Sequence, residues 1–110
     1  MGRGQTKDQV RDMSYKLKIK EEAFGDLSDA YQFYEGERPG LGEDFLSVLE
    51  SMFLKIQEHP HRYPAKYQDK RIAVVRKYPF VIIYELEEEV ITVYSVFHTS
   101  RNPEIWGKRK

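Results

Sequence analysis

Basic, aromatic and histidine side chains gather in the C-terminal part of this chain, and their types and spacing could support chemistry. They are Arg71, Arg76, Lys77, His98, Arg101, Trp106, Lys108 and Arg109. An arginine guanidinium can donate two hydrogen bonds to one phosphate, and an aromatic ring can stack on a base. The pattern therefore allows RNA cleavage or another contact with nucleic acid. The alternative is that these residues edge a sheet and that Trp106 fills the core, which we favour for Trp106.

Histidines raise two further hypotheses. His98 could act as a general acid or base, but it directly follows an expected strand, so we favour a structural or orienting role. His59 and His61 flank Pro60 at the end of an expected helix, and no third ligand is suggested, so no metal site is expected. The chain has no cysteine and no glycine-rich phosphate loop. We therefore expect no disulfide, no thiolate zinc site and no glycine-rich nucleotide site.

Charge is divided unevenly along the chain, although the formal net charge is zero. Residues 1–60 carry 8 Lys and Arg against 12 Asp and Glu, whereas residues 61–110 carry 10 against 6. This polarity suggests a basic face for an anionic partner. An ordinary solvated surface would account for it equally well.

Alternating and helical patterns position these residues. Lysines alternate with apolar residues over 14–20, which predicts a half-buried strand, and apolar residues then recur at helical spacing. The expected elements are a strand at 14–20, helices at 21–37 and 42–59, a polar loop at 61–69, strands at 71–77, 80–87 and 90–97, and a short helix after Asn102. The order predicts an α+β fold in which a two-helix antiparallel hairpin packs on an antiparallel sheet.

We expect neither a membrane helix nor a signal peptide at the start of the sequence. No apolar run approaches the ~18 residues of a membrane helix, and residues 1–13 are too polar for a signal peptide. We expect a cytoplasmic protein with a flexible tail at 1–13 and a single domain at 14–110.

Several short motifs resemble one known family. They are Pro39-Gly40-Leu41-Gly42 before Phe45-Leu46, Pro60 with Tyr63-Pro64, Arg71-Ile72 before Lys77-Tyr78-Pro79-Phe80, Ile83-Tyr84, and Val96-Phe97-His98 before Arg101-Asn102-Pro103 and Trp106. In order and spacing the chain resembles the RelE/ParE superfamily, the toxins of bacterial type II toxin–antitoxin pairs, which are linked with plasmid stabilization. The residues of these motifs resemble those of the ParE branch more than those of the RelE branch.

The resemblance implies different activities for the two branches. ParE-like members inhibit DNA gyrase and use no cofactor, whereas RelE-like members are ribosome-dependent mRNA endoribonucleases. If the chain is a nuclease, its candidate catalytic residues are Arg71, Arg76, His98, Arg101 and Trp106. However, apolar residues stand where a nuclease of this type would place basic groups, namely Ile72, Val74, Val81 and Ile83. We therefore favour a gyrase inhibitor without enzymatic activity, and keep the nuclease and a non-toxic binding relative as alternatives.

The resemblance also implies partners. A cognate antitoxin is expected to bind with a helix and an extended segment, for which a groove beside the helical hairpin and a free sheet edge would suit. Tyr31 and Phe33 are candidate contacts. Arg101, Lys108 and Arg109 are the candidate target-binding residues. Without its antitoxin, the chain could form a homodimer through bare apolar surface.

Overall fold

Residues 15–100 are described by the computed structural model of the chain. Along this part of the chain the elements are β2 (Lys16–Ile19), α1 (Glu21–Glu37), α2 (Leu41–Glu58), β3 (Ala65–Tyr67), β4 (Lys70–Val74), β5 (Phe80–Glu87) and β6 (Val90–His98). The expected N-terminal tail and the expected short C-terminal helix lie outside the described residues. The predicted α+β order of strand, two helices and three main strands is confirmed.

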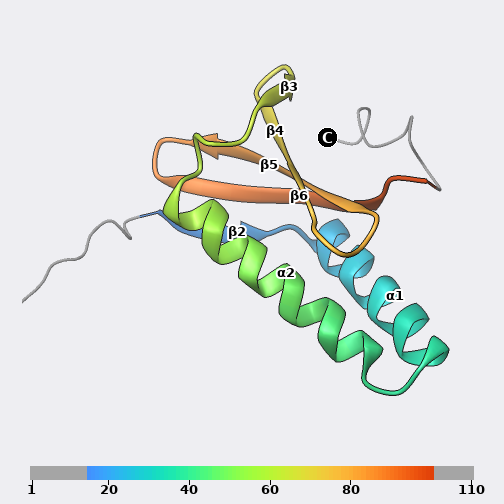
Figure 1. Cartoon of the computed structure of the whole chain (residues 1–110). Coiled ribbons are helices and arrows are strands. Elements are labelled where there is room, and N and C mark those ends of the chain that lie inside the picture. Colours follow the sequence, from blue (N-terminus) through green and yellow to red (C-terminus); the bar gives the residue numbers. More distant parts are fainter. Residues whose placement is uncertain (1–14, 101–110) are drawn as a thin grey trace, which may run out of the picture.

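The strands form one mixed sheet in the order β2-β6-β5-β4-β3 (Figure 1). β4, β5 and β6 make the expected antiparallel meander. β2 instead runs parallel to β6, with Leu17 opposite Ile91. Parallel neighbours require a long crossover connection, and the helical hairpin lies within the one between β2 and β6. The sheet is thus mixed rather than antiparallel throughout.

Both helices lie side by side on one face of this sheet (Figure 1). The α2 stripe predicted from helical spacing is buried: Phe45, Leu49, Met52 and Ile56. It packs in one cluster with every second residue of the central strands, including Phe80, Ile82, Tyr84, Ile91 and Val93. Period-3.6 and period-2 patterns thus converge on a single core.

The helical hairpin closes through Glu35. Its carboxylate accepts hydrogen bonds from the backbone N–H groups of Gly40 (3.0 Å) and Gly42 (2.9 Å). Gly40 has φ of 90°, a left-handed conformation that glycine adopts without steric penalty. At Gly42, a Cβ would lie 2.8 Å from the Tyr31 ring. This turn therefore requires its two glycines for different reasons.

Two strand boundaries differ from the sequence expectation. Part of the expected polar loop at 61–69 forms β3, which pairs antiparallel with β4. β4 itself ends at Val74 instead of continuing to Lys77. Lys77 has φ of 78°, outside the range of a strand, and Pro79 lacks the N–H that a ladder needs. Local turn geometry decides where β4 ends.

A bulge in β6 joins the sheet to α1. The register between β5 and β6 shifts between Ile83 and Tyr84, which leaves Tyr94 without an opposite residue. At this point the Asp26 carboxylate of α1 accepts hydrogen bonds from the Val96 N–H (3.0 Å) and the Ser95 hydroxyl (3.3 Å). An α1 side chain therefore satisfies polar groups where the bulge interrupts the ladder.

Candidate functional site

The sheet face opposite the helices is the candidate functional surface. Strand alternation puts Ile72, Val74, Val81 and Ile83 together there, and the antiparallel register sets Ile72 opposite Ile83 and Val74 opposite Val81. Ile72, Val81 and Ile83 form, with Phe97, a buried cluster separate from the helix-facing core. The positions at which a nuclease of the RelE type was expected to place basic groups are therefore apolar and adjacent in space.

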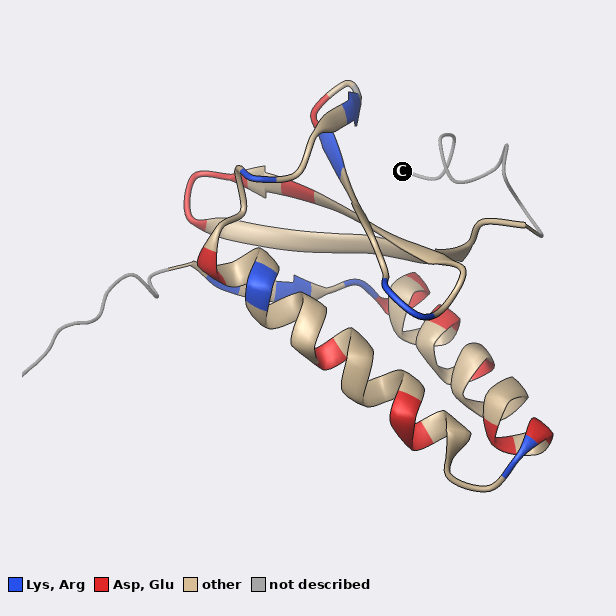
Figure 2. Cartoon of the chain, viewed as in Figure 1, with Lys and Arg blue, Asp and Glu red and all other residues tan. Residues whose placement is uncertain are grey.

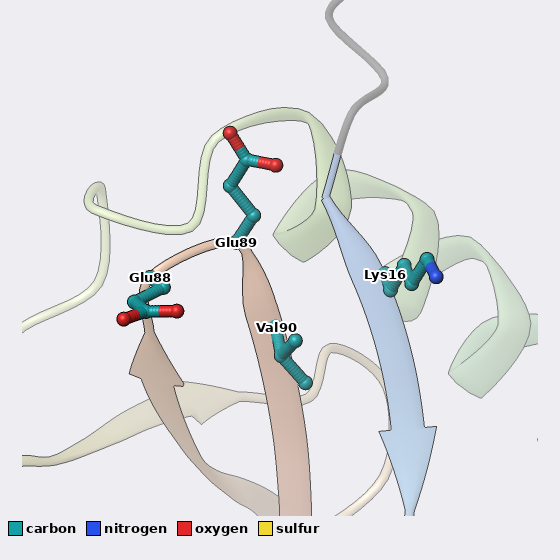
Figure 3. A pocket seen from close by; sticks show the side chains of 4 residues that line it. All are labelled: Lys16, Glu88, Glu89 and Val90. Carbon is teal, nitrogen blue, oxygen red and sulfur yellow. The ribbon is translucent and has the colours of Figure 1, made fainter.

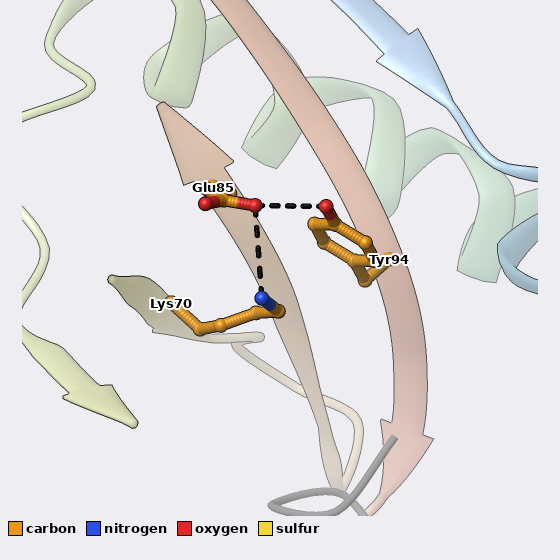
Figure 4. Close-up of polar contacts among 3 residues, drawn as sticks. All are labelled: Lys70, Glu85 and Tyr94. Atoms are coloured by element: carbon orange, nitrogen blue, oxygen red, sulfur yellow. Dashed lines mark hydrogen bonds and ion pairs between the residues drawn. The ribbon is translucent and has the colours of Figure 1, made fainter. Parts of the chain in front are cut away.

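The other half of this face is polar and was missed by the sequence analysis. Lys70 and Glu85 are opposite each other on β4 and β5, with Nζ and Oε1 3.6 Å apart (Figure 4). The Tyr94 hydroxyl donates to the same carboxylate oxygen at 2.8 Å. The Lys70 and Lys20 ammonium groups lie 4.5 and 5.0 Å from the Tyr94 ring centroid. Strand alternation was the signal that could have grouped them, but only the pairing places β2, β4, β5 and β6 side by side.

In this polar half the charged and hydroxyl groups of Lys70, Glu85 and Tyr94 interact with one another. The hydrogen bond to Glu85 raises the pKa of Tyr94 above its ordinary value and so holds the phenol neutral. Acidic residues occupy the turn between β5 and β6, whereas basic residues lie along β2 and in the loop after β4 (Figure 2). Lys70 and Tyr94 thus already have partners and do not form a free basic groove.

Arg71 has a structural position. Its Nη1 donates to the carbonyl oxygens of Tyr63 (2.6 Å) and His61 (3.3 Å). The Tyr84 hydroxyl donates to the carbonyl of Pro60 at 2.6 Å, within the core. Arg71 and Tyr84 together hold the segment after α2 against the sheet. The guanidinium of Arg71 is therefore engaged with backbone carbonyls.

Arg76 is exposed in the loop after β4, and that loop is attached to α2. The Asp44 carboxylate in the first turn of α2 accepts a hydrogen bond from the Tyr78 hydroxyl (2.5 Å) and pairs with Lys77 Nζ (2.7 Å). The hydrogen bonds from Lys77 and Tyr78 hold the pKa of Asp44 below its ordinary value. Burial and then the bond to Asp44 raise the pKa of Tyr78 to about 12. Lys77 is thus held in its positive-φ conformation by a specific contact.

His98 ends β6 and has a defined orientation. Its ring lies 5.1 Å from that of Phe80 in an edge-to-face contact. Its Nδ1 accepts a hydrogen bond from the Ser100 N–H at 3.2 Å. The geometry is that of a residue orienting the chain after β6.

The surface has two hollows, one of which contains the histidines considered as metal ligands. One, of about 470 Å³, is lined by Tyr15, Glu58, His59, Pro60, His61 and Arg62. The other, of about 540 Å³, is lined by Lys16, Glu88, Glu89 and Val90, and Lys16 points away from both glutamates (Figure 3). Within residues 15–100, no group of three or more potential ligand side chains could hold a metal ion. Neither hollow brings converging chemistry together.

The candidate antitoxin contacts lie on α1. Phe33 is 55% exposed, and its ring meets that of Tyr34 edge-to-face at 5.2 Å. Tyr31 is half-buried, and its hydroxyl donates to Glu43 on α2 at 3.1 Å. That hydrogen bond raises the pKa of Tyr31. Of the target-binding and nuclease candidates, Arg101, Trp106, Lys108 and Arg109 lie outside the described residues.

Comparison with known proteins agrees with this geometry. The family described as ParE toxin of type II toxin-antitoxin system, parDE, matches residues 17–103. A solved chain, "Chromosomal ParDE TA system from P. aeruginosa", has a TM-score of 0.70 at 16% identity, covering 78% of this chain and 97% of that one. A sequence comparison with curated proteins finds no match.

These findings define the class of protein first and then the family. The fold, a helical hairpin on one face of a sheet that contains a three-strand meander, is shared with that solved chain. The family match shows that the chain belongs to the ParE toxin family of type II toxin–antitoxin systems. No helix among residues 15–100 is long and apolar enough to cross a membrane.

Proposed function

We propose that this protein is a ParE-like toxin that stops growth by binding DNA gyrase and does not cut RNA. The observation that carries the proposal is the apolar half of the sheet face opposite the helices. There Ile72, Val81 and Ile83 stand where basic groups would be needed to hold and cleave RNA. Their neighbour Lys70 is paired with Glu85. Membership of the ParE toxin family supports the same conclusion.

A cognate antitoxin is the second proposed partner. The similar solved chain is described as part of a ParDE system, which supports an antitoxin for this chain. Phe33, exposed on α1, offers the apolar contact area that a bound helix or extended segment would cover. Tyr31, anchored to Glu43 on α2, would add a fixed aromatic side chain on a different face of α1, because residues two apart on a helix do not share a face.

Gyrase supercoiling tests the proposed activity directly. Purified protein should block supercoiling and trap cleaved DNA, and added antitoxin should reverse the block. In a translation assay the same preparation should leave messenger RNA intact. Codon-specific cuts together with undisturbed supercoiling would establish the nuclease instead.

The proposed gyrase contact is the basic C-terminal end. Changing Arg101, Lys108 and Arg109 together to alanine should weaken gyrase inhibition by about tenfold or more, because three charge-assisted contacts are lost. The matched control changes three other exposed lysines to alanine, Lys16 and Lys18 on β2 and Lys66 on β3, and so removes the same charge. Equal losses in both triple variants would indicate a general charge effect and refute a specific contact.

A further inference from the structure

Arg76 differs from the other basic residues of β4 and of the loop that follows it. Lys70 and Lys77 are paired with carboxylates, and Arg71 donates to backbone carbonyl oxygens. Arg76 is exposed, and it makes no hydrogen bond or ion pair within residues 15–100. In this part of the chain the N–H donors of its guanidinium are therefore unused.

The loop that carries Arg76, which follows β4 and contains basic residues (Figure 2), is attached to α2 and to the chain after β6. The Asp44 carboxylate of α2 binds Lys77. The Thr99 N–H and hydroxyl both donate to the Pro79 carbonyl oxygen, at 2.9 and 3.3 Å. Lys77 has φ of 78°, which is unfavourable for a residue with a Cβ, and such backbone persists where surrounding contacts enforce it, often at functional sites. A loop held in this way presents Arg76 at a low entropic cost to a binding partner.

Exposed apolar surface lies directly beside Arg76. Val74 is 67% exposed, which makes it the most exposed large hydrophobic residue within the described part of the chain. Val74 and Arg76 flank Val75, whose side chain is buried in the core beneath the helices. Protein interfaces are apolar at their centre and enriched in arginine. Val74 and Arg76 together therefore have the composition of a protein-binding surface.

We propose that Val74 and Arg76 form a docking surface for an acidic segment of the protein that this toxin inhibits. The Arg76 guanidinium binds a carboxylate of that segment through two parallel hydrogen bonds, and a neighbouring apolar side chain covers Val74. The inference rests on the proposed function, which names gyrase as the inhibited protein. It adds a second contact to the proposed basic C-terminal end.

An acidic protein segment suits this surface better than a nucleic acid backbone does. DNA carries closely spaced phosphates, and proteins bind it by neutralising several of them at once. At the end of β4, however, the cation next to Arg76 is Lys77, which is already paired with Asp44. One unused arginine beside an exposed valine matches one carboxylate beside an apolar side chain.

Binding of purified gyrase to the full chain, measured without DNA, tests the inference. Arg76→Gln should weaken binding by about tenfold or more, because a charge-assisted bidentate contact is lost. Arg76→Lys should lose most of the same affinity, since an ammonium group cannot reproduce the planar fork. Arg62→Gln is the matched control, because it removes the same charge from an exposed arginine in the loop after α2. It should change the affinity by less than about twofold.

A charge placed at the apolar position gives a second measurement. Val74→Asp sets a carboxylate against the acidic segment, so gyrase binding should again fall by about tenfold or more. Gln68→Asp adds the same charge at an exposed position between β3 and β4 and should bind like wild type. Thermal unfolding checks that each variant is folded. If Val74→Asp fails to fold, the comparison of Arg76→Gln with Arg62→Gln decides the case.

The possible results separate this inference from the proposed function. If wild type binds gyrase and Arg76→Gln binds equally well, or loses no more than Arg62→Gln, the docking surface is refuted and gyrase binding stands. A loss for Arg76→Gln that appears only when DNA is present would assign the arginine to a phosphate, and the inference would be wrong. Wild type that does not bind gyrase at all would refute the proposed function and the inference with it.

Discussion

Several side chains tie loops of this fold to other elements through polar contacts. The Tyr84 hydroxyl is anchored on the Pro60 carbonyl, and Arg71 holds the carbonyls of the same segment. On the other side of the molecule, Asp44 receives both Lys77 and Tyr78. In the sequence, Arg71 and Lys77 belonged to the cluster that could support chemistry. Their contacts show instead that they hold loops in place.

Removing the Tyr84 hydroxyl should destabilise the protein. Tyr84→Phe leaves the Pro60 carbonyl without its buried donor, so we expect the free energy of unfolding to fall by about 1–3 kcal/mol. Urea denaturation measures it, and an unchanged slope against urea would show that the two end states are the same. A change below about 0.5 kcal/mol would mean that water replaces the hydroxyl.

Acid should remove the contribution of Asp44. Its pKa in the folded protein is lowered from an ordinary value of 3.8, so its contribution is present above that pH and is lost as the pH falls through the lower folded value. Wild type should therefore exceed Asp44→Asn in melting temperature at neutral pH, and the two should converge in acid. Asp29→Asn, an exposed change on α1, is the control and should parallel wild type. A constant gap between wild type and Asp44→Asn across this range would contradict the prediction.

At the scale of elements, the turn between α1 and α2 and the loop after β4 set the geometry. Glu35 ties the turn by accepting from Gly40 and Gly42, and Asp44 ties the loop to the start of α2. The two helices are thereby fixed to each other and to the sheet. The turn motif could be recognised in the sequence, but its Glu35 contacts could not, because they depend on how closely the helices approach.

Gly42 should not tolerate a side chain. A Cβ there would lie 2.8 Å from the Tyr31 ring and 2.9 Å from Glu35 Oε1, so Gly42→Ala should destabilise the protein by about 1–3 kcal/mol. Gly25→Ala is the matched control, since no atom lies within 4 Å of its added Cβ within α1. It should stabilise by about 0.5–1 kcal/mol through helix propensity. Thermal unfolding of both variants checks the opposite signs, and two changes of the same sign would refute the explanation.

At the scale of the whole molecule, the sheet divides the protein into two sides with different roles. One side buries the core beneath the helical hairpin, and the outer surface of that hairpin leaves Phe33 and Leu54 exposed. The other side joins an apolar patch to a network of paired charges. These two surfaces are where we propose that the partners bind.

Antitoxin binding should distinguish the exposed residues of the hairpin. Phe33→Asp should weaken capture of the cognate antitoxin by about tenfold or more, since an exposed aromatic contact costs that much when lost at the centre of an interface. Leu54→Asp, at a position 58% exposed on α2, is the control and should bind like wild type. Titration calorimetry measures both. A larger loss for Leu54→Asp would move the proposed contact surface to α2.

The sequence by itself determined the positions of both helices, the three-strand meander and the family resemblance. Hydrophobic spacing is a local property, so α1 and β5 were predicted at their observed bounds. Only the tertiary structure decided the parallel pairing of β2 with β6, because its hydrogen-bond partners are distant in the chain. The structure also showed β3 and the bulge at Tyr94, which no hydrophobic period in the sequence marks. It also decided the candidate surface. The basic and aromatic residues near the C-terminus suggested chemistry, but the pairing of β4 with β5 joins apolar side chains into one patch and commits Lys70 to Glu85.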